Sequence, residues 1–141
     1  HLARAVLPGM RARGHGRIIN IASVHGLVAS VDKGAYVAAK HGLVGLTKVI
    51  ALENAEIDIT CNAICPGWVR TALVEKQIVA RAERDGVSLD AAQRVLLAEK
   101  EPTLRFTAVE DIAAAVLFLA GPAGANITGT TLALDGGWTA R

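Results

Sequence analysis

The sequence predicts an α/β protein in which helices cover a parallel, doubly wound β-sheet. Three apolar or β-branched runs, "RIINIAS" (17–23), "IDITCNAI" (57–64) and "GTTLALDGG" (129–137), alternate with longer helical segments. This alternation favours right-handed β-α-β crossovers and therefore a parallel sheet. Apolar residues make up 52% of the 141-residue chain and charged residues 20%, a balance typical of a globular domain rather than a disordered chain.

The first two elements are a helix and a buried strand. "LARAVLPGMRARG" is typical of a helix that ends at Gly14 with basic residues near its carboxyl end. "RIINIAS" is almost continuously apolar, as expected of a parallel strand covered on both faces. Ser23 falls at the carboxyl end of this strand.

A long helix is predicted over residues 35–53, apolar on most sides and therefore covered on both. Ala38, Gly42 and Gly45 form one stripe of small residues, and Tyr36 and Lys40 share roughly the opposite face. Each interior glycine costs about 1 kcal/mol relative to Ala, so we expect a closely packed partner to offset that cost.

The second strand, "IDITCNAI", ends at Pro66 and Gly67. It carries Cys61, and Cys65 follows within the same run. In an extended strand these residues lie about 13 Å apart, beyond the roughly 7 Å that a disulfide can bridge. We therefore expect two reduced cysteines that pack in the core.

The lid segment, residues 71–105, is more charged and predicts two short helices, with Gly86 ending the first and Ser88 capping the second. "TAVEDIAAAVLFLAGP" then predicts a helix with Thr107 and Glu110 as a capping box. The third strand completes the chain.

Three strands leave one sheet edge unpaired and one face incompletely covered, and residue 1 is His rather than Met. We therefore expect residues 1–141 to be a single partial domain, the carboxyl-terminal half of a doubly wound fold or a processed piece of it.

Composition argues against several classes of protein. The net charge is +2 with scattered Lys and Arg, which disfavours a nucleic-acid or anionic-membrane partner. We find no apolar run near the roughly 20 residues of a membrane span and no signal peptide, so we expect a cytoplasmic protein. Four His and two Cys without clustered spacing predict no metal site.

Chemistry is expected where the strands end, because ligands of open parallel sheets bind beyond the carboxyl ends of the strands. Ser23, the Pro66 turn and the 135–137 turn lie at such ends, and the helix bearing Tyr36 and Lys40 begins on the same side. A Lys ammonium one helical turn away favours the phenolate form of Tyr, which then serves as an acid/base. A nearby Ser hydroxyl can hold a reacting oxygen.

Ser23, Tyr36 and Lys40 within "NIAS…YVAAK", with "CPGWVRT" and "ITGTTLALDGGW", resemble the active-site signature of the short-chain dehydrogenases/reductases. The resemblance spans nearly all 141 residues and implies a Rossmann-type sheet. It implies that Tyr36 is the general acid/base, that Lys40 assists it and holds the nicotinamide ribose, and that Ser23 binds the reacting oxygen.

The resemblance also implies a nicotinamide cofactor, which we expect to be NAD. Pro66, Gly67, Val69 and Thr71 match the turn that holds the carboxamide end of nicotinamide. The family's Gly-rich phosphate loop, its ribose-selecting residue and its catalytic Asn belong upstream of His1, so we expect the 141 residues alone to be inactive. NAD versus NADP preference is not encoded in this part.

Within the family, the likeness is strongest to members that act on a small hydroxy carboxylate. Lys33 matches the residue that binds the carboxylate, and His25 and Gln77 match two hydrogen-bonding residues. Trp68 and Trp138 are candidates to exclude water and limit substrate size. Structural alternatives are a solvated Lys33, ordinary polar residues at 25 and 77, and a packing role for Trp68.

Three other readings of the whole chain stay open. It could belong to a related reductase of another 3-oxo or secondary-alcohol substrate, or to a non-catalytic module derived from such an enzyme. If instead the 141 residues are the complete product, weak stability and no nicotinamide binding are expected. The stripe at Ala38, Gly42 and Gly45 and the family resemblance together predict a homo-oligomer, commonly a tetramer.

Overall fold

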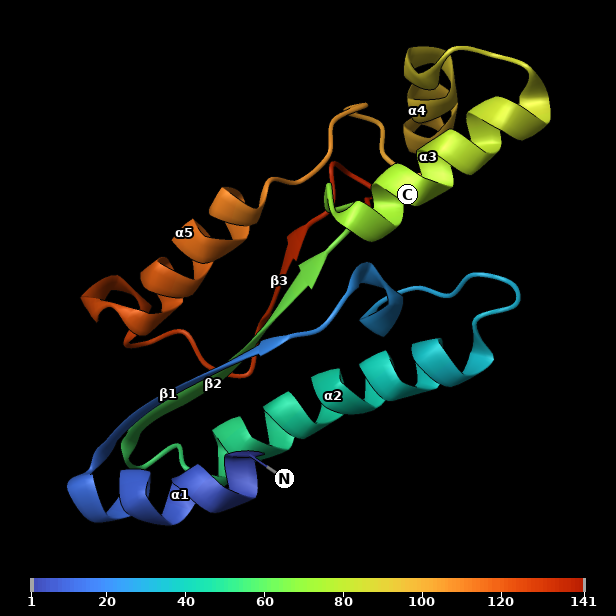
Figure 1. Cartoon of the computed structure of the whole chain (residues 1–141). Helices are drawn as coiled ribbons and strands as arrows, with labels where there is room; N and C mark the ends of the chain where they lie inside the picture. Colours follow the sequence, from blue (N-terminus) through green and yellow to red (C-terminus); the bar gives the residue numbers. More distant parts are fainter. Residues whose placement is uncertain (1, 141) are drawn as a thin grey trace.

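Parallel strands form the centre of the computed structural model, which describes residues 2–140 (Figure 1). Within those residues the sheet has three strands in the order β1-β2-β3. Their bounds are β1 (His15–Ile21), β2 (Asp58–Pro66) and β3 (Thr131–Leu134). Both pairings are parallel, and the register runs from His15 opposite Asp58 to Ile21 opposite Ile64. The predicted α/β class and parallel sheet are confirmed.

Helices lie on both faces of this sheet. α1 (Leu2–Arg13) and α2 (Gly34–Glu53) cover one face, and α5 (Val109–Ala120) lies against the other (Figure 1). The central strand β2 is buried from Ile59 onward, as its continuous apolar sequence requires.

The two cysteines of β2 behave as the sequence predicts. Cys61 packs with Ile50 and Ala51 of α2, and Cys65 packs with Val44. Both thiols are buried and free. Burial raises the pKa of the Cys61 thiol to about 11, so this sulfur stays protonated and unreactive at neutral pH.

The described residues cover only one side of helix α2. Val44, Thr47 and Ile50 are buried against the sheet, whereas Leu52 is 78% exposed. Apart from the backbone of α2 itself and the adjoining residues, no described atom would lie within 4 Å of a Cβ on Gly42 or Gly45. Residues 2–140 thus cover one of the two sides that we expect to be covered, and the side with Gly42 and Gly45 stays open to the separate partner that the sequence predicts.

The length of α2 corrects the sequence analysis. With 20 residues and a mean hydropathy of 1.2, α2 is long and apolar enough to cross a membrane, although core helices of globular domains share these properties. It packs on β2 through its buried face and carries Lys40 and Lys48. This packing favours a domain helix.

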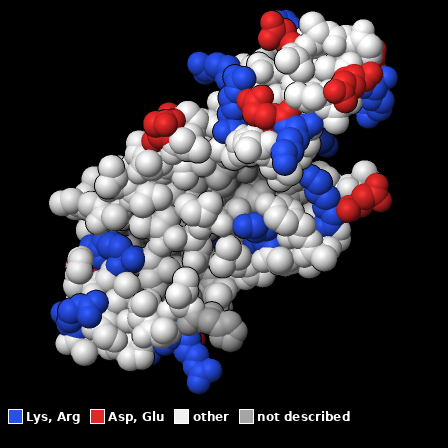
Figure 2. Space-filling view, viewed as in Figure 1, with Lys and Arg blue, Asp and Glu red and all other residues white. Residues whose placement is uncertain are grey.

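The lid segment contains the two predicted helices, α3 (Ala72–Asp85) and α4 (Leu89–Ala98), joined at Gly86 and Ser88. Gly86 adopts φ +64°, and the Ser88 hydroxyl accepts the Ala91 N–H, so both predicted helix boundaries are confirmed. The two helices share their own apolar cluster, with Trp68 and Phe106 packed against it. Figure 2 shows Lys, Arg, Asp and Glu gathered most densely over these helices.

The predicted capping box of α5 is wrong. The Thr107 hydroxyl donates to the Leu134 carbonyl at 2.8 Å, so it holds β3 instead of capping the helix. The Asp111 carboxylate accepts the Ala108 N–H at 3.2 Å, and Ala108 is the residue at the cap. The helix starts one residue later than the pattern suggests, because the Thr107 hydroxyl bonds to strand β3 and Ala108 takes the cap position.

Candidate active site

A cavity of about 540 Å³ lies at the carboxyl ends of the strands. It is lined by every residue that the sequence suggests for substrate binding: Ser23, His25, Lys33, Tyr36, Trp68, Gln77 and Trp138. Gly67, Val69 and Thr71 line the same cavity. Lys40 and Pro66 do not line it; Pro66 is the buried last residue of β2.

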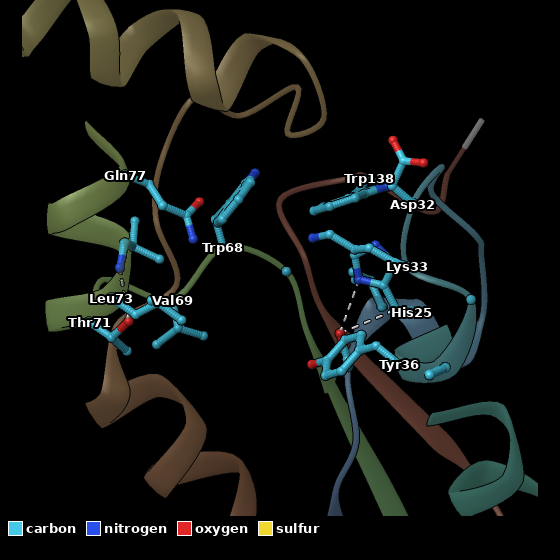
Figure 3. Close-up of a pocket in the computed structure, with 16 residues that line it drawn as sticks. His25, Asp32, Lys33, Tyr36, Trp68, Val69, Thr71, Leu73, Gln77 and Trp138 are labelled. Carbon is cyan, nitrogen blue, oxygen red and sulfur yellow. Dashed lines mark hydrogen bonds between the residues drawn. The ribbon is translucent and has the colours of Figure 1, made fainter. Parts of the chain in front are cut away.

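The cavity has two walls (Figure 3). Tyr36, His25, Lys33 and Trp138 stand on one side, and Trp68, Val69, Leu73 and Gln77 stand on the other, toward α3. The first wall comes from the sheet ends and the start of α2, and the second from the lid segment and the turn before it. A ligand between the walls would contact both parts of the chain.

Ser23 and His25 are held together by a single 3₁₀ turn, η1 (Val24–Gly26). The Ser23 hydroxyl accepts the His25 N–H at 3.2 Å and lies 3.5 Å from His25 Nδ1. This turn packs tightly on α2, because a Cβ on Gly26 would come within 2.9 Å of the Lys40 carbonyl oxygen. The close approach fixes Ser23 relative to the helix that carries Tyr36.

His25 is buried beneath the cavity. Its Nε2 lies 3.0 Å from the Ser30 hydroxyl, and its ring contacts Tyr36 edge-on at a centroid distance of 5.7 Å. Burial lowers the pKa of His25, and the nearby positive charges of Lys33 and Lys100 lower it further. His25 therefore stays neutral at neutral pH and offers hydrogen bonds without a charge.

Tyr36 and Lys40 lie together, as their spacing predicts. Tyr36 is 47% exposed beside the cavity, and the Lys40 ammonium lies 5.6 Å from the centroid of its ring. The same ammonium donates to the Ile21 carbonyl at 3.2 Å, which ties α2 to the end of β1. This arrangement places a fixed positive charge beside an accessible phenol.

Lys33 precedes the first residue of α2 and carries its cation into the cavity. Its Nζ lies 5.9 Å from the Trp68 ring centroid, and Figure 3 shows it pointing across the gap toward that ring. Trp68 and Trp138 are 6.3 Å apart, and Trp138 also contacts His25 at 5.4 Å. The two indoles thus form apolar surfaces around a cation.

The turns beyond β2 and β3 are joined to each other. The Gly67 N–H donates to the Leu134 carbonyl at 2.9 Å. The Asp135 carboxylate accepts N–H groups of Gly137 and Thr139 and the Thr139 hydroxyl. Burial acts to raise the pKa of Asp135, but these hydrogen bonds outweigh it and hold the pKa below its ordinary value. The ionised Asp135 therefore braces the loop that carries Trp138.

Six residues that line the cavity were not predicted from the sequence: Val24, Asp32, Gly34, Ala35, Leu73 and Val74. Asp32 lines it from a loop position with φ +61°, and Leu73 lines it from the first turn of α3. Asp tolerates positive φ in turns, so "VDKG" held a signal for a tight loop but none for a cavity. Among residues 2–140, no three His, Cys, Asp or Glu side chains are grouped so that they could hold a metal ion.

Comparison with known proteins assigns the class to which this fold and site belong. Residues 1–139 match the family model described as Enoyl-(Acyl carrier protein) reductase. The chain belongs to the short-chain dehydrogenase/reductase family.

Two curated relatives carry a more particular name. The chain is 51% identical to the D-beta-hydroxybutyrate dehydrogenase of Cupriavidus necator and 52% identical to that of Rhizobium meliloti. In both cases all 141 residues of this chain match 55% of the relative. The chain thus spans about half the length of the curated relatives it matches.

Solved structures share the fold. An actinorhodin polyketide ketoreductase with NADPH superposes with a TM-score of 0.83 at 38% identity, covering 94% of this chain and 51% of the other. A 4-hydroxyisoleucine dehydrogenase complexed with NADH superposes with a TM-score of 0.77 at 33% identity, covering 99% and 54%. Nicotinamide cofactors are therefore bound by structural neighbours of this chain.

Proposed function

We propose that this chain is part of an NAD-dependent D-3-hydroxybutyrate dehydrogenase, which oxidises D-3-hydroxybutyrate to acetoacetate reversibly. The observation that carries the proposal is one cavity shared by Ser23, Tyr36 and Lys33, with the Lys40 ammonium 5.6 Å from the Tyr36 ring. A hydroxyl group and a carboxylate on one small molecule could meet these groups at the same time. The two curated relatives with this name support the choice of substrate.

In the oxidative direction, Tyr36 as phenolate takes the proton of the substrate hydroxyl while the C3 hydrogen leaves as hydride. The Lys40 ammonium stabilises the phenolate, and the Ser23 hydroxyl donates to the substrate oxygen as it becomes a carbonyl. When bound, nicotinamide supplies the hydride acceptor. Lys33 binds the carboxylate, His25 and Gln77 add hydrogen bonds, and Trp68 and Trp138 limit substrate size.

The residues present fit the nicotinamide end of such a cofactor. Gly67, Val69 and Thr71 line the cavity opposite Tyr36, and the buried Trp68 Nε1 has no hydrogen-bond partner among the described residues. We assign Pro66, Gly67, Val69 and Thr71 to the carboxamide side and Tyr36 and Lys40 to the ribose side. NAD is proposed as the cofactor, with the support that a structural neighbour, a 4-hydroxyisoleucine dehydrogenase, is complexed with NADH.

The test uses the protein expressed from its complete coding sequence, with NAD and D-3-hydroxybutyrate, and measures NADH absorbance. Turnover is expected with the D enantiomer and not with the L enantiomer. Tyr36→Phe should lower kcat by about 100-fold or more, because it removes the acid/base group and leaves the ring in place. Full turnover by Tyr36→Phe would contradict the assignment and favour a non-catalytic reading of this site.

A related reductase of another 3-oxo substrate is the second candidate, favoured by the 38% identity to the polyketide ketoreductase. A bulkier 3-oxo ester turned over with a higher kcat/KM than acetoacetate would select it. For the whole protein we further propose a cytoplasmic homotetramer without nucleic-acid or membrane partners. The uncovered side of α2, with Gly42 and Gly45, supports a subunit contact there.

A further inference from the structure

Glu101 is a buried carboxyl group that the proposed mechanism does not use. It follows α4 in residues 99–108, the stretch that leads from the two lid helices back to the sheet and that we call the segment returning from the lid, and its side chain is 0% exposed. Its Oε1 accepts the backbone N–H of Trp68 at 2.5 Å, and its Oε2 has no hydrogen-bond partner among residues 2–140. Burial of a carboxyl oxygen without a hydrogen bond lowers the stability of the fold. A structural or functional role of Glu101 would offset that loss.

The fold makes room for this carboxyl group with two glycines. A Cβ on Gly67 would lie 2.2 Å from Glu101 Oε1, and a Cβ on Gly136 would lie 3.3 Å from Oε2. Any larger residue at either position would displace the Glu101 side chain or the turn that carries the glycine. The carboxyl group therefore sits in a site built by the turns after β2 and β3.

The backbone around Glu101 is tied to the same turns. The Leu104 N–H donates to the Glu101 carbonyl at 3.0 Å, and the Thr103 N–H donates to the Gly136 carbonyl at 3.1 Å. The segment returning from the lid is thus fixed to the turn after β3. It reaches the turn after β2 through the Glu101 side chain and through the Thr107 N–H, which donates to the Trp68 carbonyl at 2.9 Å.

We propose that Glu101 is a positioning residue that holds the turn of Gly67 and Trp68 against the segment returning from the lid. Because Trp68 belongs to the cavity wall toward α3, Glu101 also holds that part of the wall in place. Trp68 faces Lys33, so a displaced turn would alter both the substrate and the nicotinamide sides of the cavity. The consequence for ligand binding rests on the function proposed above, whereas the tie between Glu101 and the turn does not.

Protonation of Glu101 gives this tie a pH dependence. Burial raises the pKa of Glu101 to about 7, against the lowering effect of the Trp68 N–H, and the negative charge of Asp135 raises it further. Opening of the turn would return the carboxyl group to water and to its ordinary pKa. Deprotonation therefore favours opening, and protection of the turn falls as pH rises through about 7.

The direct test is backbone hydrogen exchange at Trp68, measured in the protein expressed from its complete coding sequence. Glu101→Ala should speed exchange by about tenfold or more relative to wild type, because the acceptor is lost. Glu101→Gln keeps a carbonyl acceptor and should restore most of the protection. The matched control is Glu83→Gln, which changes an exposed carboxylate of α3. Unchanged Trp68 exchange in Glu101→Ala would overturn the proposal.

If Glu101→Ala does not fold, Glu101→Gln decides the matter. After correction for intrinsic exchange, wild-type protection at Trp68 should fall between about pH 4.5 and pH 7 and level off above that range, and the fall should vanish in Glu101→Gln. An equal fall in both proteins would overturn the proposal.

Measurements of substrate KM and NADH Kd distinguish a failure of this inference from a failure of the proposed function. Glu101→Ala should raise the KM for D-3-hydroxybutyrate and the Kd for NADH by about tenfold, with a smaller change in kcat, and Glu101→Gln should restore both. Wild-type protein that shows the exchange behaviour but binds no NADH would reject the function and leave the tie to the turn standing. Normal ligand binding in a folded Glu101→Ala protein would reject the positioning role.

Discussion

Under the proposed function, Lys33 is the residue that binds the substrate carboxylate. Its ammonium lies beside Trp68 rather than in an ion pair with a described carboxylate, so it is available to a ligand. Lys33→Ala should raise the KM for D-3-hydroxybutyrate by about 10- to 100-fold, the value of one charge-assisted hydrogen bond. The KM for its methyl ester, which has no charge, should change little.

Steady-state kinetics with both compounds checks this prediction. Lys48→Ala is the matched control, because Lys48 is an exposed lysine of α2, the helix that Lys33 precedes. Equal KM changes for the acid and the ester would mean that Lys33 acts by shape alone and would remove the carboxylate role.

Residues at strand ends were predictable from the sequence, whereas the buried carboxyl group was not. Ser23 follows an unmistakable apolar strand, and Tyr36 and Lys40 share one helix face by their spacing. Glu101 lies in "AEKEPTLR", a polar stretch that any solvated loop could contain. Its burial depends on Gly67 and Gly136, which are distant in the sequence, and a local pattern carries no information on that contact.

Among the elements, the contact between η1 and α2 sets the distance from Ser23 to Tyr36. Gly26→Ala would place a Cβ 2.9 Å from both the Lys40 carbonyl oxygen and Val44 Cγ2. Because neither neighbour is the end of a long flexible side chain, the turn must move. We expect a loss of about 1–3 kcal/mol in the free energy of unfolding and a lower kcat.

Denaturant unfolding and turnover of Gly26→Ala test this contact. Gly9→Ala is the control, since apart from the nearby backbone of α1 and the adjoining residues its new Cβ would meet only the flexible Arg13 Nη1, at 3.2 Å, among the described atoms. Glycine in a helix interior is unfavourable, so this control should gain up to about 1 kcal/mol. A similar gain for Gly26→Ala would show that η1 tolerates separation from α2.

Element types were predictable because each has a strong local period or boundary residue. Gly86 and Ser88 marked the break between α3 and α4, and the structure has both. The role of Thr107 was not predictable, because a Thr hydroxyl can cap a helix or donate a hydrogen bond to a strand carbonyl equally well. The sequence also could not predict which element covers each side of α2, since an apolar helix face predicts burial but does not identify the segment that packs on it.

Across the whole molecule, Glu101 should make stability depend on pH. A carboxyl group whose pKa is raised in the folded state stabilises the fold below its unfolded value and loses that contribution as pH rises through the folded value, here about 7. Relative to Glu101→Gln, wild-type protein should therefore lose up to about 3 kcal/mol between about pH 4.5 and pH 7.

Urea unfolding of both proteins across this pH range measures the difference. The comparison removes the titration of all other groups, because they are common to both chains. A constant difference in the free energy of unfolding from pH 4.5 to pH 7 would mean that Glu101 titrates in the folded protein as it does in water.

Helices α3 and α4 have an apolar cluster of their own. Trp68 and Phe106, which lie just before and after the two helices, pack against it. The pair can consequently change in length or surface without disturbing the packing beneath Ser23, Tyr36 and Lys40. The cavity wall that carries Leu73 and Gln77 is thus separable from the wall that carries Tyr36. If the proposed function holds, a foreign helical pair grafted between Trp68 and Phe106 should change substrate preference and leave the Ser23, Tyr36 and Lys40 group in place.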